Sequence, residues 1–139
     1  MKRLMLFALL GGLSLTAPAQ TAPDSEVRIR GYQIELPVRP HLMFRSDFDV
    51  YKGAYELSNG DVMTLTRTGQ RMYAQIGNNE RKELVAAKFN QFVALDKELK
   101  ITLERDDFIG DFGGEVLMKV RTPLAQAGEG QIVRLVSSR

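Results

Sequence analysis

A short pattern repeats between Tyr51 and Val120: a run in which apolar and polar side chains alternate, followed by a tight turn. Alternation with a period of two places the apolar side chains on one face of a β-strand, where a core can bury them. Short strands joined by turns at this spacing are typical of a sandwich or a barrel. We therefore predict an all-β fold, an antiparallel meander of about eight strands that closes into a small barrel. The turns contain Asn59-Gly60, Thr68-Gly69, Gly77-Asn78-Asn79 and Gly113-Gly114.

The same alternation predicts where the strands begin and end. In the first strand the phase slips by one residue at Gly31, which is typical of a β-bulge. Asn59-Gly60 predicts a type I′ turn, because that turn needs positive φ at both central residues. The segment from His41 to Asp49 predicts a short helical turn capped by Ser46, and the first and last strands could pair to close the barrel. The expected strands are Val27–Leu36, Tyr51–Ser58, Val62–Arg67, Arg71–Ile76, Glu83–Ala87, Phe89–Leu95, Leu99–Glu104, Glu115–Val120 and Gln131–Val136.

Residues 1–19 have the features of an export signal. Lys2 and Arg3 precede an apolar stretch from Leu4 to Leu15, and Ala17-Pro18-Ala19 provides the small residues of a cleavage site. The alternative is an N-terminal membrane anchor, but the apolar stretch is shorter than the ~20 residues that span a bilayer. We expect a periplasmic or secreted protein with a flexible lead-in over residues 20–26 and a single β-barrel domain over residues 27–137.

The charge of the chain argues against nucleic acid as a partner. The sequence has 19 Lys and Arg against 17 Asp and Glu, and two of the basic residues, Lys2 and Arg3, lie in the export signal. Without that signal the two signs balance at 17 each, so there is no bulk positive field for a phosphate backbone. The sequence contains no cysteine, so the core alone has to hold the domain together.

Residues 48–120 carry a family resemblance. The motifs are Tyr51-Lys52-Gly53-Ala54-Tyr55-Glu56-Leu57, Val62-Met63-Thr64-Leu65-Thr66-Arg67 and Gly69-Gln70-Arg71-Met72-Tyr73-Ala74-Gln75-Ile76-Gly77. This stretch resembles the lipocalin-like barrel domain that often follows the catalytic domain of bacterial β-lactamase-related serine hydrolases. The resemblance covers about half of the chain, and its turn glycines and strand aromatics imply a lipocalin-like fold rather than a chemistry.

The catalytic residues of that hydrolase family have no counterpart here. The family's nucleophile lies in an S-x-x-K motif, and no serine of this sequence is followed three residues later by lysine. The one histidine, His41, has neither a cysteine nor a G-x-S-x-G serine to pair with. We therefore expect a barrel without the hydrolase domain, no enzymatic activity and no cofactor.

Two groups of residues are candidates for a binding site. Aromatic side chains could line the lumen of the barrel around a small apolar ligand, although a filled core is the favoured alternative. Acidic residues after the seventh expected strand could hold Ca²⁺, but their spacing does not match a known calcium loop, and a solvated loop is favoured. The lumen candidates are Tyr55, Tyr73, Phe89 and Phe92, and the metal candidates are Asp106, Asp107, Asp111 and Glu115.

These observations predict an exported, non-enzymatic β-barrel module that binds a protein partner or a small apolar ligand. The alternatives are an envelope-associated accessory protein and, more remotely, a weak hydrolase or calcium-binding protein that uses the acidic loop of residues 104–115.

Overall fold

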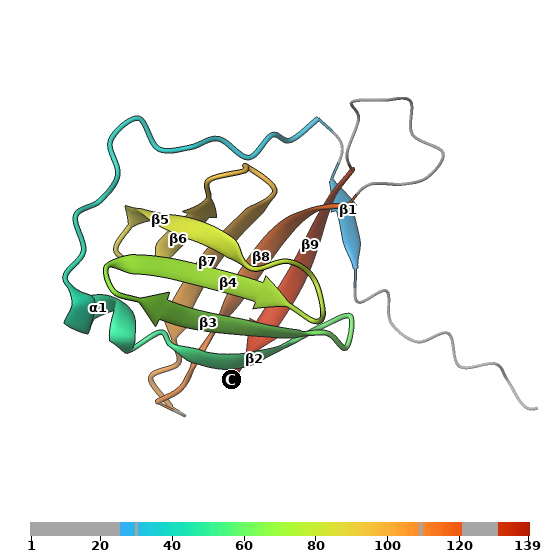
Figure 1. The fold of residues 1–139 in the computed structure, drawn as a ribbon. Helices are drawn as coiled ribbons and strands as arrows, with labels where there is room; N and C mark the ends of the chain where they lie inside the picture. The colour runs from blue at the N-terminus through green and yellow to red at the C-terminus, as the bar shows by residue number, and fades with distance from the viewer. Residues whose placement is uncertain (1–25, 30, 109, 121–130) are drawn as a thin grey trace, which may run out of the picture.

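The computed structural model describes residues 26–29, 31–108, 110–120 and 131–139, and these residues form nine strands and one short helix (Figure 1). The predicted lead-in at residues 20–26 and the export signal lie outside this part, apart from Glu26. The elements are β1 (Val27–Ile29), α1 (Arg45–Asp49), β2 (Gly53–Leu57), β3 (Val62–Thr68), β4 (Arg71–Ile76), β5 (Lys82–Lys88), β6 (Gln91–Ala94), β7 (Leu99–Arg105), β8 (Phe112–Val120) and β9 (Gln131–Ser138).

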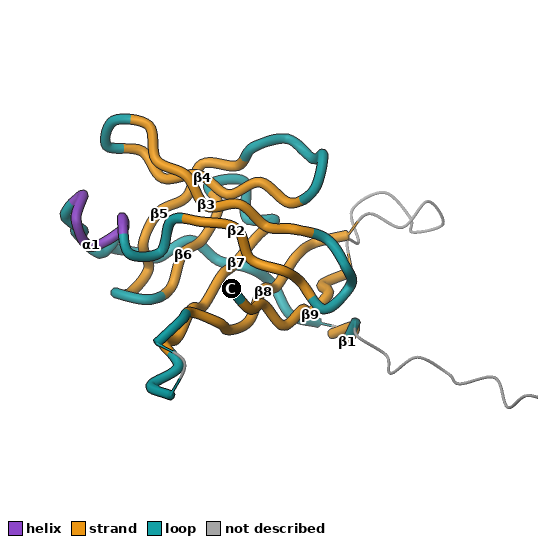
Figure 2. The backbone as a smooth tube through the Cα atoms, turned by 90° about the horizontal axis from the view of Figure 1, so that it is seen from below, coloured by secondary structure: helices purple, strands orange, loops and turns teal. Residues whose placement is uncertain are grey.

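The predicted all-β barrel is confirmed. Strands β2 to β9 form a closed antiparallel barrel of eight strands, and β1 is an additional strand on its side. Each strand from β2 to β8 pairs with the next along the chain, so the connections are hairpins. Figure 2 shows α1 on one side of the barrel and β1 on the other.

Strand β9 closes the barrel because its two edges have different partners. One edge pairs with β8 over the whole length of β9. The other edge is shared, since Ile132–Arg134 pair with β1 and Ser137–Ser138 pair with β2. The expected pairing of the first and last strands is therefore confirmed, but closure comes from β2 and not from β1.

Side chains fill the middle of the barrel. Ile101, Val116 and Leu135 lie side by side on three adjacent strands and are fully buried. Each such side chain contributes about 1.5–3 kcal/mol relative to an exposed position. The buried cluster consists of Phe48, Tyr51, Tyr55, Leu57, Met63, Leu65, Ala74, Ile76, Leu84, Ala86, Phe92, Ala94, Leu99, Ile101, Leu103, Val116, Val133 and Leu135.

A second, smaller core lies on the outer face of the barrel. The chain after β1 leaves the sheet and runs along the outside as an extended segment, residues 31–40, before it reaches α1 (Figure 1). Ile34 of this segment is buried with the outward side chains of Val93, Leu117 and Ile132. We call residues 31–40 the strap. Leu117 falls between the inward residues Val116 and Met118 and therefore points outward, and the strap explains why it is nevertheless buried.

Three local predictions are wrong in detail. The first strand ends at Ile29 instead of Leu36, because the strap packs on the barrel wall and does not extend the sheet. The N-cap of α1 is Phe44 and not Ser46; its backbone N–H donates to Asp47 Oδ2 at 3.1 Å. The loop between β2 and β3 is longer than a two-residue type I′ turn, and only Gly60 in it has positive φ.

Candidate binding site at one end of the barrel

The α1 end of the barrel brings together three side chains from neighbouring strands. In β7, Leu103 points inward, and the period of two places Arg105 on the same face. Arg105 pairs in register with Phe112 at the start of β8. Phe112 O accepts a hydrogen bond at 3.0 Å from the backbone N–H of Arg139, which follows β9. Two arginines thus flank one aromatic ring, and we call these three residues the end row.

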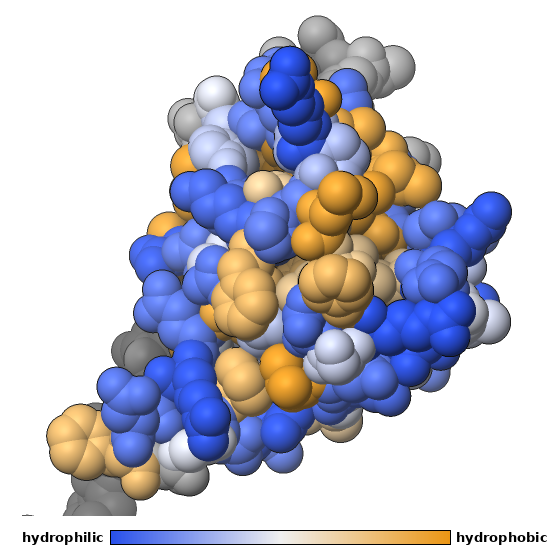
Figure 3. All heavy atoms as spheres, turned by 90° about the vertical axis from the view of Figure 1, so that its left-hand side faces the viewer, coloured by the Kyte–Doolittle hydropathy of each residue, from blue (hydrophilic) through white to orange (hydrophobic). Residues whose placement is uncertain are grey.

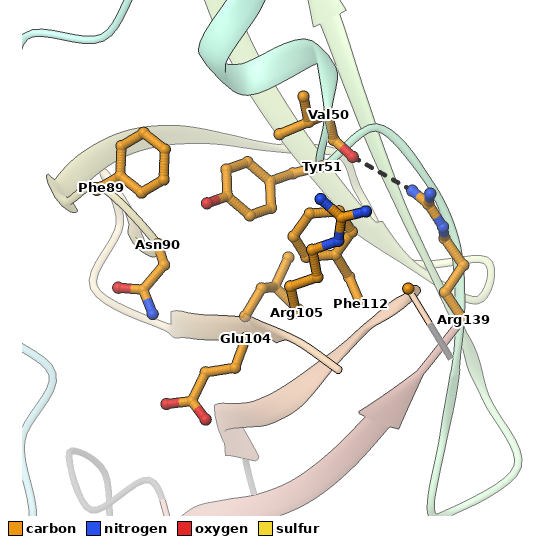
Figure 4. Close-up of a pocket in the computed structure, with 10 residues that line it drawn as sticks. Val50, Tyr51, Phe89, Asn90, Glu104, Arg105, Phe112 and Arg139 are labelled. Carbon is orange, nitrogen blue, oxygen red and sulfur yellow. Dashed lines mark hydrogen bonds between the residues drawn. The ribbon is translucent and has the colours of Figure 1, made fainter. Parts of the chain in front are cut away.

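A pocket of about 790 Å³ lies over this row. Its floor is aromatic, because the Tyr51 ring packs against Phe112 at 4.9 Å and against Phe89 at 6.2 Å between ring centroids. Figure 4 shows these side chains around one space, with Phe89 opposite the end row. The lining residues are Val50, Tyr51, Phe89, Asn90, Leu103, Glu104, Arg105, Gly110, Phe112 and Arg139.

Tyr51 seals the pocket from the core. It is almost fully buried, and its ring also packs edge-on against Phe92 at 5.4 Å. The Tyr51 carbonyl accepts a hydrogen bond of 2.7 Å from the Tyr55 hydroxyl. Burial raises the pKa of both tyrosine hydroxyls above its ordinary value. The pocket is therefore an indentation in the end of the barrel that stops at the filled core.

Arg139 is held in place by many partners. Its Nε donates to Asp111 Oδ1 at 2.8 Å, and its Nη1 donates to the carbonyl of Lys52 at 3.0 Å. The guanidinium also lies 5.8 Å from the ring centroid of Tyr55. Gly53 makes room for it, because a Cβ there would stand 3.3 Å from Arg139 Cδ. Arg139 therefore ties the end of β9 to the start of β2.

Arg105 differs from Arg139 because, among the described residues, no ion pair or hydrogen bond holds its side chain. Its neighbour Glu104 points away from it (Figure 4). Two nearby carboxylates have other partners: Asp111 binds Arg139, and Asp106 Oδ1 accepts from the Phe108 N–H at 2.8 Å. The Arg105 guanidinium is thus an available cation beside an apolar floor.

The four predicted lumen aromatics do not gather around one cavity. Tyr55 and Phe92 are fully buried in the filled core. Tyr73 alternates with the inward residues of β4 and lies on the outer face, where the Arg81 guanidinium stacks 3.9 Å from its ring centroid. Phe89 is 58% exposed and lines the pocket. Of the four, Phe89 alone belongs to the candidate site.

The acidic candidates do not converge on a metal site. Asp111 binds Arg139, and Glu115 forms an ion pair with Arg134. Asp107 is exposed, and Asp106 closes its own turn. In the part of the chain that the structure describes, no three His, Asp or Glu side chains are grouped to hold a metal ion.

Sequence reasoning missed the end row. Arg105 was assigned to the acidic loop, although continuing the alternation of Leu99, Ile101 and Leu103 by one step places it on the inward face. The positions of Phe112 and Arg139 depend on the pairing of β8 with β9, for which the sequence has no local signal.

Comparison with protein-family models, with curated proteins and with solved structures finds no match for this chain. Of the helices in the described residues, none has the length and apolar character needed to cross a membrane.

Proposed function

We propose that this protein is an exported, non-catalytic β-barrel module that binds a small apolar ligand in the pocket at the α1 end. The observation that carries the proposal is the pocket itself. Its volume of about 790 Å³ falls within the ~300–1,000 Å³ of small-molecule sites, and its floor consists of packed aromatic rings. A few polar groups at the edge, including Arg105, are also typical of such sites.

The proposed absence of catalysis rests on the residues of the site. Among the described residues, neither a serine nor a histidine lines the pocket, and the sequence has no cysteine. His41 is exposed on the segment before α1 and does not line the pocket. A nucleophile that acts with a general base would need such a pair within hydrogen-bonding reach.

Export and the resemblance to the lipocalin-like domain belong to the same proposal. The export signal predicts that the protein isolated from its native compartment begins at Gln20, and intact-mass spectrometry tests this. A mass that retains residues 1–19 would contradict cleavage. Strands β2 to β9 form a closed barrel, which is the fold that the resemblance implies.

The ligand proposal can be tested with a neutral apolar fluorophore such as N-phenyl-1-naphthylamine, which brightens when it leaves water. We expect binding, and displacement by straight-chain 1-alkanols from octanol to dodecanol. Affinity should rise about fourfold per added CH₂, because burying one CH₂ contributes ~0.8 kcal/mol. Failure of the fluorophore and of every alkanol to bind would contradict the proposal.

A matched pair of variants locates the binding. Phe89→Ser removes an exposed ring from the pocket and should weaken fluorophore binding. Phe108→Ser removes an exposed ring on the loop before β8 that does not line the pocket, so it should bind as the parent does. Equal affinities for the two variants would place the ligand elsewhere.

A protein partner is the second candidate function, and exposed apolar side chains around the same end favour it. Leu42 is 93% exposed and Phe44 is 79% exposed. Figure 3 shows apolar side chains gathered on this end of the molecule among hydrophilic ones. Clustered apolar side chains at a surface often mark a protein contact. Pull-down from envelope extract tests this, with Leu42→Ser/Phe44→Ser losing the partner and Phe108→Ser retaining it.

A further inference from the structure

We infer that the ligand of this pocket is an amphiphile with a single alkyl chain and an anionic head, and that Arg105 binds the head. This inference rests on the proposed function and adds the chemical class of the ligand. It depends on the difference between the two arginines of the end row.

Arg105 lies at the boundary between the apolar interior of the barrel and the solvent. An arginine on the inward face of a barrel strand, one step beyond the fully buried Leu103, lies where the apolar interior ends. The long stem of arginine packs along apolar surface while its guanidinium stays at the edge. This geometry places a cation at the mouth of an apolar indentation, where the head of an amphiphile would lie.

Protein groups already occupy the guanidinium of Arg139 but not that of Arg105. Arg139 already donates to Asp111 and to the backbone carbonyl of Lys52, so an added anion would have to displace these partners. Arg105 has no such partners among the described residues. A bound carboxylate or phosphate would therefore gain charge-assisted hydrogen bonds from Arg105 without breaking any within the protein.

The apolar floor of the pocket would bind the alkyl chain of the ligand. The pocket floor of Tyr51, Phe89 and Phe112 offers apolar surface but few hydrogen-bonding groups. A fully polar anion would leave this surface in contact with water, whereas an alkyl chain would cover it. The two halves of the site thus select a ligand with one anionic end and one apolar end.

The test compares three probes with twelve-carbon chains at pH 8: laurate and dodecyl phosphate below their critical micelle concentrations, and 1-dodecanol below its solubility limit. We expect laurate, dodecyl phosphate or both to bind at least about tenfold more tightly than the alcohol, as charge-assisted hydrogen bonds allow. The relative affinity of the two anions identifies the head group as carboxylate or phosphate. In Arg105→Gln the preference for the anions should disappear while dodecanol affinity is retained.

Two further variants make the result specific. Arg105→Glu should invert the preference, so that dodecylammonium binds more tightly than laurate. Arg81→Gln removes a cation from the connection between β4 and β5, which lies at the end of the barrel away from α1 (Figure 1), and should leave every affinity unchanged.

Equal binding of laurate, dodecyl phosphate and dodecanol to the parent protein would overturn the anionic head but leave the apolar pocket standing. An anion preference that survives Arg105→Gln would overturn the role of Arg105. No binding of any probe would overturn this inference together with the proposed function.

Discussion

The middle of the barrel and its α1 end are lined by the same inward faces of β7, β8 and β9, the last continued by Arg139, but different kinds of residue occupy the two regions. In the middle, Ile101, Val116 and Leu135 fill the space between the walls. At the end, Arg105 and Arg139 flank Phe112, and a pocket of about 790 Å³ remains. Charged side chains are rarely buried, so their appearance in an inward row marks where the core stops.

The residues that fill the core and the exposed residues of the proposed binding site are therefore largely different. Beyond Tyr51, towards the α1 end, the side chains of Phe89 and Arg105 are exposed, so substitutions there should disturb the packing less. Substitutions in the two regions should therefore have different consequences, which the following predictions test.

The largest expected effect is a difference in stability between alanine substitutions of Phe92 and Phe89. Phe92→Ala should lower the free energy of unfolding by about 3–5 kcal/mol, because it leaves a cavity in the core next to Phe48 and Tyr51. Phe89→Ala should change it by no more than about 0.5 kcal/mol, because the ring is 58% exposed. Urea denaturation of both variants measures this difference. Similar losses would mean that the α1 end is part of the structural core.

The next effect concerns the outer core. Ile34→Ala should destabilise the protein by about 2 kcal/mol or more, because Ile34 is buried against Val93, Leu117 and Ile132. Val38→Ala, in the same strap but fully exposed, is the control and should have no measurable effect in thermal unfolding. A neutral Ile34→Ala would show that the strap does not stabilise the barrel wall.

A smaller effect on stability is expected at Ser137, whose hydroxyl lies in the row of inward residues next to the end row. Ser137 is buried on β9 beside Gly114, and its Oγ has no hydrogen-bond partner among the described residues. Ser137→Ala should raise the free energy of unfolding by about 1 kcal/mol, because it removes an unpaired buried polar group. Exposed Ser138→Ala provides the control. A clear loss of stability in Ser137→Ala would contradict this reading.

The smallest expected effect is a pH dependence at the α1 end. Hydrogen bonds from Arg67 hold the pKa of Asp49 at about 2, below its usual value of 3.8, and Lys52 acts in the same direction. The pair therefore stabilises the fold above pH 3.8, and its contribution is lost as the pH falls toward 2. Melting temperatures between pH 2 and pH 5 should fall more steeply for the parent than for Asp49→Asn. Exposed Asp107→Asn should follow the parent, and parallel curves for all three would contradict the assignment.

The fold was accessible from the sequence because alternation and turns are local signals. The alternation of Leu99, Ile101 and Leu103 predicts the inward face of β7. The bounds predicted for β4 agree with the structure at both ends. The strap could not be predicted from the sequence, because the pattern around Ile34 is equally typical of a strand. Whether it extends the sheet or packs on the wall depends on contacts with residues about 60 to 100 positions away.

The candidate site was only partly accessible. Phe89 was predicted to bind a ligand, but in the lumen of the barrel. The presence of an aromatic residue does not indicate whether its side chain points into the barrel or lies at its end. Tyr73 could have been excluded, since it falls between the inward residues Met72 and Ala74. Predicting the end row would have required the register in which β7, β8 and β9 pair. Register depends on how the strands pair and not on the sequence of any one strand.

The most direct test of the proposed binding module is an amide NMR titration with 1-decanol, which carries no charge and therefore probes the pocket apart from Arg105. We predict saturable shifts concentrated at residues 50–51, 89–90, 103–105 and 112 around the α1 end. Resonances of Ile132–Arg134, where β9 pairs with β1, should not move. Shifts centred on that opposite region, or no saturable shifts at all, would contradict a ligand site at the α1 end of the barrel.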